Sequence, residues 1–284
     1  MARRTGFLAA IGALITGCSA TAALNALVPE QTYRGREGLV FGHGARDRLD
    51  LYQPLSPPPG KAPPLVVFFY GGNWNSGERG DYRFVGEALA SGGAIAVIPD
   101  YRLVPSVHYP EFLDDNARAM AWVFEHAAEL GGDPDNIYIM GHSAGAYNAA
   151  MLALDPRWLG TRRQQLKGFI GIAGPYDFLP IKNPATQRAF NWPDTPPASQ
   201  PVAYAAQKAP RTLLLAAASD ALVDPQRNTV GLGQHLKAAG TDVTVKVFDK
   251  VSHTTVIGAM ARPLRFLAPV RAHVLAFLGL PTQE

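Results

Sequence analysis

Short apolar runs alternate with longer segments of helical periodicity over most of this chain of 284 residues. Residues 112–130 carry apolar side chains at helical spacing, and residues 144–154 are rich in alanine with no helix breaker. This alternation predicts an α/β fold, in which a mostly parallel central sheet carries helices on both faces. The apolar runs typical of buried strands lie at residues 65–70, 94–98, 137–140, 168–173 and 212–217.

Both ends of this pattern contain further predicted strands. Residues 39–41 and 49–52 flank a Gly-His-Gly sequence, which predicts an antiparallel hairpin or a pair of edge strands, and residues 242–248 alternate as a last strand. The regular pattern is lost at residues 176–210, where seven prolines are interspersed with aromatic residues. This segment is either a short cap over the sheet or a set of small packing clusters. The predicted domain, cap included, spans residues 39–284.

The first seventeen residues differ from the rest of the chain. Two arginines precede an apolar run at residues 7–15, which ends in the sequence Ile-Thr-Gly-Cys18. This sequence resembles the processing site of bacterial lipoproteins, in which the cysteine carries lipid and becomes the first mature residue. The resemblance implies a signal peptide at residues 1–17, a lipidated Cys18 and a tether at residues 18–38. The apolar run is too short to span a bilayer as a permanent helix.

An ordinary signal peptide cut later, at Ala20 or Ala23, is the alternative. It would make the protein periplasmic or secreted, whereas a lipid on Cys18 predicts a membrane-anchored lipoprotein of the bacterial cell envelope. Two of the 26 Lys and Arg residues precede Cys18, which leaves 24 against 23 Asp and Glu residues. This nearly neutral mature chain has no basic segment that suggests nucleic acid as a partner.

Cys18 is the only cysteine, so the sequence offers neither an internal disulfide nor a thiolate cluster for a metal. Histidines and carboxylates do not occur at zinc-ligand spacing, and the sequence contains no phosphate-binding loop motif. The sequence therefore predicts neither a metal nor a cofactor. It makes no prediction of the oligomeric state.

The pentapeptide Gly141-His142-Ser143-Ala144-Gly145 joins a predicted strand directly to a predicted helix. A Gly-x-Ser-x-Gly sequence in this context is typical of a nucleophile elbow, a tight turn that holds a serine hydroxyl exposed at its apex. The two glycines lack the Cβ atoms that would collide where strand and helix approach closely. Ser143 is therefore the candidate nucleophile.

A second motif, Gly-Gly-Asn-Trp at residues 71–74, directly follows the first predicted central strand. Together with the elbow, it resembles the α/β-hydrolase esterases that carry a His-Gly-Gly-(Gly/x)-Trp loop. These include hormone-sensitive-lipase-like and feruloyl-esterase-like carboxylesterases, and the related arylformamidases. The resemblance covers about residues 39 to 280 and implies an α/β-hydrolase fold. It also implies an oxyanion hole formed by the backbone N–H groups of Gly72, Asn73 and Ala144.

Tyr70 stands where these families have the loop histidine. A tyrosine is able to replace the packing of that histidine and one of its hydrogen bonds. Further along the chain, the sequence Asp100-Tyr-Arg102-Leu also matches the families. Asp100 and Arg102 are predicted to hold the core and neighbouring loops by ion pairs.

In α/β-hydrolases the catalytic residues follow one another along the chain in the order Ser, acid, His. Asp220 leaves the strand predicted at residues 212–217, and it occupies the first position of the families' Asp-x-x-Val pattern. Asp224 and Asp249 are the alternatives for the acid. His253 is the candidate base, because it alone among the seven histidines follows the acid on a loop after a strand.

These features predict a serine carboxylesterase that hydrolyses short-chain or aryl esters through an acyl-enzyme on Ser143. The brief cap favours small esters, because it would cover only a modest pocket. An arylformamidase-like amidase, with an N-formylkynurenine-type substrate, is the alternative, and a non-catalytic envelope scaffold on a hydrolase fold is a third hypothesis. The predicted export argues against the amidase, and the intact Ser, Asp, His order argues against the scaffold.

Overall fold

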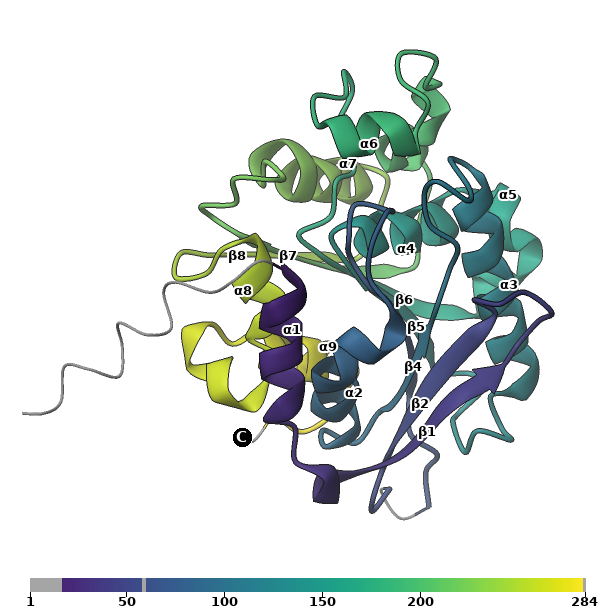
Figure 1. Cartoon of the computed structure of the whole chain (residues 1–284), viewed down its shortest axis with the longest axis vertical. Helices are drawn as coiled ribbons and strands as arrows, with labels where there is room; N and C mark the ends of the chain where they lie inside the picture. Colours follow the sequence, from purple (N-terminus) through teal and green to yellow (C-terminus); the bar gives the residue numbers. More distant parts are fainter. Residues whose placement is uncertain (1–16, 58–59, 283–284) are drawn as a thin grey trace, which may run out of the picture.

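The computed structural model describes residues 17–57 and 60–282, with side chains from residue 21 onward. Within this part of the chain, eight strands form one sheet in the order β1-β2-β4-β3-β5-β6-β7-β8 (Figure 1). β2 pairs antiparallel with β1 and β4, and every other neighbouring pair is parallel. The predicted mostly parallel sheet is confirmed. The strands are β1 (Tyr33–Val40), β2 (Arg48–Pro54), β3 (Leu65–Phe69), β4 (Ile95–Pro99), β5 (Ile137–His142), β6 (Leu166–Ile172), β7 (Arg211–Ala217) and β8 (Val243–Phe248).

Helices lie on both faces of this sheet, as the α/β prediction requires. α2 and α9 cover one face, and α3 and α4 cover the other (Figure 1). The α-helices of the described chain are α1 (Gly17–Ala26), α2 (Arg83–Ala90), α3 (Glu111–His126), α4 (Ala144–Leu154), α5 (Pro156–Leu159), α6 (Pro184–Ala189), α7 (Gly231–Ala238), α8 (His253–Gly258) and α9 (Val270–Phe277). None of the helices among the described residues has the length and apolarity needed to cross a membrane.

The central strands β3 and β5 form the middle of the core. Every residue of both strands is buried, because helices cover the sheet on each side. This is why their sequences are continuous apolar runs rather than alternating patterns. Parallel strands end at a common edge of the sheet, and the loops that leave β3, β5, β7 and β8 there carry the candidate site residues.

The segment predicted to be a tether, residues 18–38, contains regular structure that packs on the domain. α1 occupies its first part, and β1 pairs with β2 from Tyr33 onward, so the sheet begins before residue 39. The Asn25 side chain holds α1 in place: its Nδ2 donates to the carbonyl oxygen of Gly80 (2.8 Å), and its Oδ1 accepts from the amide N–H of Phe84 (3.1 Å). Residues 1–16 of the predicted signal peptide and the side chain of Cys18 lie outside the described structure.

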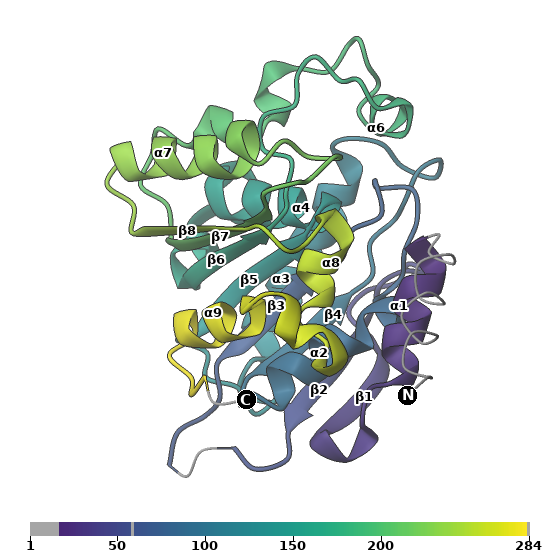
Figure 2. The same cartoon turned by 90° about the vertical axis from the view of Figure 1, so that its left-hand side faces the viewer.

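The cap segment, residues 176–210, contains α6 and two short 3-10 helices, η4 (Pro197–Ser199) and η5 (Pro201–Tyr204). In Figure 2 it forms the uppermost part of the molecule. The rings of Phe178 and Phe190 pack against Trp74, with centroids 6.3 and 4.8 Å away. The two interpretations of this segment therefore combine, because its aromatic residues form a packing cluster that also attaches the cap to the loop after β3.

Candidate active site

Ser143 occupies the sharp turn between β5 and α4. Its backbone has φ 53° and ψ −124°, a strained conformation for a residue with a side chain. A Cβ built on Gly141 would lie 2.2 Å from the carbonyl oxygen of Gly145, and one built on Gly145 would lie 2.0 Å from that of Phe69. Both positions therefore require glycine, and the close approach of helix and strand that they permit holds Ser143 at the apex.

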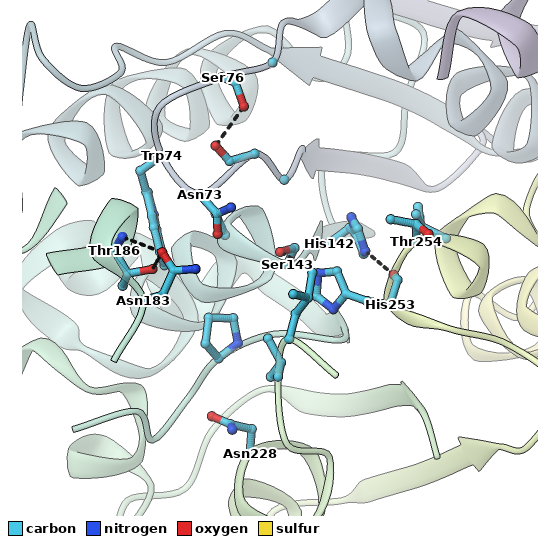
Figure 3. A pocket seen from close by; sticks show the side chains of 18 of the residues that line it. Asn73, Trp74, Ser76, His142, Ser143, Asn183, Thr186, Asn228, His253 and Thr254 are labelled. Carbon is cyan, nitrogen blue, oxygen red and sulfur yellow. Dashed lines mark hydrogen bonds between the residues drawn. The ribbon is translucent and has the colours of Figure 1, made fainter. Parts of the chain in front are cut away.

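Two hydrogen bonds link Ser143 to His253 and His253 to Asp220. His253 Nε2 is 2.8 Å from Ser143 Oγ, and His253 Nδ1 is 2.7 Å from Asp220 Oδ2. Ser143 comes from the elbow, Asp220 from the loop after β7, and His253 from the first residue of α8. Figure 3 shows Ser143 beside the His253 ring. The structure thus brings together three residues that the sequence places far apart.

The carboxylate of Asp220 is held by its own loop as well as by His253. Its Oδ1 accepts from the amide N–H groups of Leu222 and Val223, each at 2.9 Å. Burial alone would raise the pKa of Asp220, but the hydrogen bonds from His253 and from these two amides outweigh it, so this pKa is lowered. A carboxylate that stays ionised beside Nδ1 orients the imidazole with Nε2 free to accept a proton.

Within the described residues, neither of the two alternative acids is hydrogen-bonded to His253, although Asp224 also lines the pocket. Asp224 Oδ1 accepts from the amide N–H groups of Gln226 and Arg227, at 2.8 and 3.2 Å, so this carboxylate caps the turn that follows it. Asp249 is exposed just after β8. Of the three candidate acids, the structure brings Asp220 to His253.

The predicted oxyanion-hole residues line the same pocket as Ser143. Gly72 and Asn73 both have positive φ angles, 131° and 49°, and a Cβ on Gly72 would lie 2.2 Å from the carbonyl oxygen of Ser76. The amide N–H groups of Gly72, Asn73 and Ala144 donate to no acceptor in the described part of the chain. Unpaired amides beside a serine hydroxyl are available to a substrate oxygen.

Tyr70 connects this loop to a buried ion-pair cluster. Its hydroxyl donates to Asp100 Oδ1 (2.8 Å) and accepts from Arg46 Nη2 (2.7 Å). Asp100 in turn accepts from the amide N–H of Arg79 (2.8 Å) and pairs with its guanidinium. Both ends of residues 70–79 are therefore fixed to Asp100. The ion pairs predicted for Asp100 and Arg102 are confirmed, Arg102 pairing with Asp115.

Sequence reasoning missed His142, which is buried directly before Ser143. Its Nε2 lies 3.0 Å from the carbonyl oxygen of His253. Burial, followed by the neighbouring charge of His253, lowers the pKa of His142 to about 3. His142 is therefore neutral at physiological pH, and Figure 3 shows it on the same side of Ser143 as His253. Its place inside the elbow motif was the available signal.

A pocket of about 650 Å³ opens beside Ser143. The cap contributes Phe178 and Ile181 to its lining, and α8 contributes Ile257. α1 also reaches the pocket, through Thr21 and Leu24, which the sequence did not indicate. Among the described residues, no group of three or more His, Cys, Asp or Glu side chains is arranged to hold a metal ion.

Comparisons with known proteins agree with this geometry. The chain is 34% identical over 146 residues to the probable isoprenylcysteine alpha-carbonyl methylesterase ICME of Oryza sativa subsp. japonica, a match that covers 49% of this chain and 35% of that protein. It is 45% identical over 98 residues to carboxylesterase NlhH of Mycobacterium tuberculosis, covering 34% of this chain and 31% of that protein. The matched segments thus span about a third of the length of these relatives.

Among solved structures, esterase B from Lactobacillus rhamnosis has the same fold. The two structures superimpose with a TM-score of 0.77 at 17% sequence identity, and the match covers 92% of this chain and 91% of that one. The sequence model of the BD-FAE family matches residues 49–236, which is more than half of the chain and includes Ser143, Asp220 and the loop after β3. The chain therefore belongs to the BD-FAE family of α/β-hydrolase proteins.

Proposed function

We propose that this protein is a serine carboxylesterase that hydrolyses short-chain or aryl esters through an acyl-enzyme on Ser143. The observation that carries the proposal is the pair of hydrogen bonds linking Ser143 Oγ to His253 and His253 to Asp220. A serine hydroxyl is a weak nucleophile unless an adjacent base removes its proton. The names of the relatives, a carboxylesterase and a methylesterase, support esters as the substrate class.

In the first step, Ser143 Oγ attacks the carbonyl carbon of the ester while His253 Nε2 takes the hydroxyl proton. The π electron pair of the carbonyl moves to its oxygen, which accepts hydrogen bonds from the N–H groups of Gly72, Asn73 and Ala144. One donor of this kind lowers the barrier by about 3 kcal/mol. Asp220 remains ionised and stabilises the imidazolium that forms on His253.

In the second step, the carbonyl reforms and the bond to the alcohol oxygen breaks. His253 protonates the leaving alcohol, and Ser143 is left acylated. Water then attacks the acyl carbon and gives a proton to His253, which returns it to Ser143 Oγ as the carboxylic acid departs. The cycle consumes one ester and one water and regenerates the neutral imidazole.

A panel of chromogenic esters of rising acyl length, run beside N-formylkynurenine, tests this proposal. We expect p-nitrophenyl acetate or butyrate to be turned over fastest, and Ser143→Ala to lose more than about a thousandfold of that activity while the far-UV circular dichroism stays unchanged. Faster turnover of the formamide than of every ester would favour the arylformamidase-like alternative. A folded wild-type protein that turns over neither would favour the non-catalytic scaffold.

We also propose that the protein is anchored in the bacterial envelope through lipid on Cys18. The Ile-Thr-Gly-Cys sequence and the absence of any other cysteine support this proposal. Cys18 lies in α1 three residues before Thr21, so the two Cα atoms are separated by about 4.5 Å along the helix axis. Because Thr21 lines the pocket, an anchor at Cys18 would hold the pocket close to the membrane rather than far from it.

Detergent partitioning and mass spectrometry of the first mature peptide test the anchor. We expect the wild-type protein to enter the detergent phase with lipid mass on Cys18, and Cys18→Ser to lose both properties. A single acyl chain binds membranes only marginally, so the peptide should carry more than one. A wholly soluble wild-type protein whose N-terminus lies at Ala20 or beyond would instead indicate a periplasmic or secreted protein.

A further inference from the structure

We propose that α1 forms the wall of the substrate pocket that faces the alcohol part of a bound ester, here called the alcohol-side wall. We also propose that the Leu24 side chain determines which alcohols this part of the ester can contain. This inference rests on the proposed esterase function and adds a specificity element to it. α1 lies outside residues 49–236, the part of the chain that the BD-FAE family model matches. The contribution of α1 to the wall therefore lies outside that shared region.

α1 is fastened in a way that fixes the position of Leu24. The neighbouring side chain, Asn25, donates to Gly80 and accepts from the amide N–H of Phe84 at the start of α2. Leu24 is half-buried, and a Cβ built on Gly258 would lie 3.8 Å from its Cδ1. The Leu24 side chain thus packs across the pocket rim against the end of α8. Figures 1 and 2 both show α1 near α8, with α6 further away.

The chemistry of the leaving group assigns this side of the pocket to the alcohol. His253 Nε2 must protonate the departing oxygen, so that oxygen lies within hydrogen-bond distance of the ring. α8 begins at His253 and continues along the pocket with Ile257. Figure 3 shows His253 and Thr254 on one side of Ser143. An alcohol group that extends from the leaving oxygen along α8 therefore meets Leu24.

The acyl chain of the ester is bonded to the carbonyl carbon that also carries the leaving oxygen. It extends away from His253. On that side, Figure 3 shows Trp74, Asn183 and Thr186. The cap supplies Ile181 to the same lining. The two arms of the ester thus meet different elements of the chain, with α1 and α8 on the alcohol arm and the cap on the acyl arm.

The large side chains of the alcohol-side wall are apolar, and the smaller Thr21 and Thr254 also line it. The wall includes Leu24 together with Phe84 and Ile257, which are only 1% and 5% exposed. Apolar side chains discriminate between alcohols by the apolar area that each methylene removes from water. The ligand class that fits the wall is therefore an ester of an alkyl or aryl alcohol rather than of a polyol.

Two ester series distinguish effects on the alcohol part of the ester from effects on its acyl part. One series varies the alcohol of an acetate from ethyl to octyl, and the other varies the acyl group of a p-nitrophenyl ester from acetate to octanoate. We expect Leu24→Ala to change the kcat/KM ratio of long to short alcohols by about fivefold or more while leaving the acyl ratio within about twofold. Ile181→Ala should instead change the kcat/KM ratio of long to short acyl groups and leave the alcohol ratio within about twofold. Leu27→Ala, a change at an exposed position directly after the end of α1, should alter neither ratio.

Asn25→Ala provides a second route to the same result, because it removes both hydrogen bonds that fasten α1 without changing Leu24. It should change the kcat/KM ratio of long to short alcohols in the same direction as Leu24→Ala does. The inference is overturned if both variants hydrolyse esters with the wild-type alcohol profile, or if they change the acyl profile instead. A wild-type protein that hydrolyses neither series refutes the proposed function itself, which distinguishes the two failures.

Discussion

His142 Nε2 donates a hydrogen bond to the carbonyl oxygen of His253 at 3.0 Å, and the two imidazole rings lie with their centroids 5.1 Å apart. A carbonyl oxygen only accepts, so the Nε2 of His142 carries the proton. The residue before the candidate nucleophile thus holds the backbone of the candidate base. This contact ties the end of β5 to the start of α8.

Replacing His142 should therefore misplace His253. We expect His142→Leu, which lacks a donor, to lower kcat by about ten- to a hundredfold with little change in KM. His142→Gln carries an amide donor of similar reach and should retain kcat within about threefold of wild type. Steady-state kinetics on one p-nitrophenyl ester measure both variants. Equal losses in the two variants would mean that the ring acts through packing rather than through its hydrogen bond.

The same residue should make the protein sensitive to acid. The pKa of His142 is lowered from 6.5 to about 3, so below pH 6.5 the unfolded chain binds a proton that the folded chain does not. The contribution of His142 to the free energy of unfolding is fully present above pH 6.5 and is lost as the pH falls toward 3. Urea unfolding of wild type and His142→Gln at pH 7 and pH 5 measures this. The variant should lose less stability between these pH values, and an identical loss would contradict the pKa shift.

Asp220 should matter for turnover far more than the neighbouring carboxylates. Asp220→Asn keeps the side-chain shape but reverses the hydrogen bond to His253 Nδ1, which selects the wrong tautomer, so kcat should fall by about ten-thousandfold. Asp224→Asn is the matched control, because Asp224 caps a turn and does not contact His253. It should retain kcat within about threefold. A larger loss of kcat at Asp224 than at Asp220 would transfer the role of the acid to Asp224.

Tyr70 should stabilise the loop after β3 through its hydroxyl. We expect Tyr70→Phe to lower the free energy of unfolding by about 1–3 kcal/mol, because the buried Asp100 and the half-buried Arg46 each lose a hydrogen bond. Tyr52→Phe is the control, since Tyr52 is buried but its hydroxyl makes no hydrogen bond within the described residues. Urea unfolding followed by fluorescence compares them. Equal effects of the two substitutions would mean that the hydrogen bonds of the Tyr70 hydroxyl to Asp100 and Arg46 do not add to the stability of the fold.

The approach of Ser143, Asp220 and His253 could be predicted because topology constrains it. Each residue follows a strand that the hydrophobic pattern identifies, and parallel strands end at one edge of the sheet. The pattern also identified the central strands β3 and β5, whose runs are buried on both faces. Chain order and strand ends were sufficient, and no side-chain contact had to be known. The catalytic roles of the three residues stay a prediction.

The contribution of α1 and the start of β1 could not be predicted in the same way. β1 is an edge strand with a mostly exposed pattern, so its sequence shows no apolar alternation. α1 is ordered by Asn25, whose amide reaches Gly80 and Phe84, 55 and 59 residues away. His142 likewise acts through a residue 111 positions later. Contacts of single polar side chains over such separations have no periodic signature in the sequence.

The central claim is that Ser143 is the nucleophile of an ester hydrolase, and covalent labelling tests it most directly. Paraoxon, an organophosphate with a p-nitrophenolate leaving group, reacts with activated serine hydroxyls, and mass spectrometry of the digested protein locates the adduct. We predict a single diethylphosphoryl group on the peptide that contains Ser143, formed in proportion to the loss of p-nitrophenyl ester hydrolysis and absent from Ser143→Ala. Full ester hydrolysis after complete modification of Ser143, or inactivation by an adduct on another residue, would contradict the account.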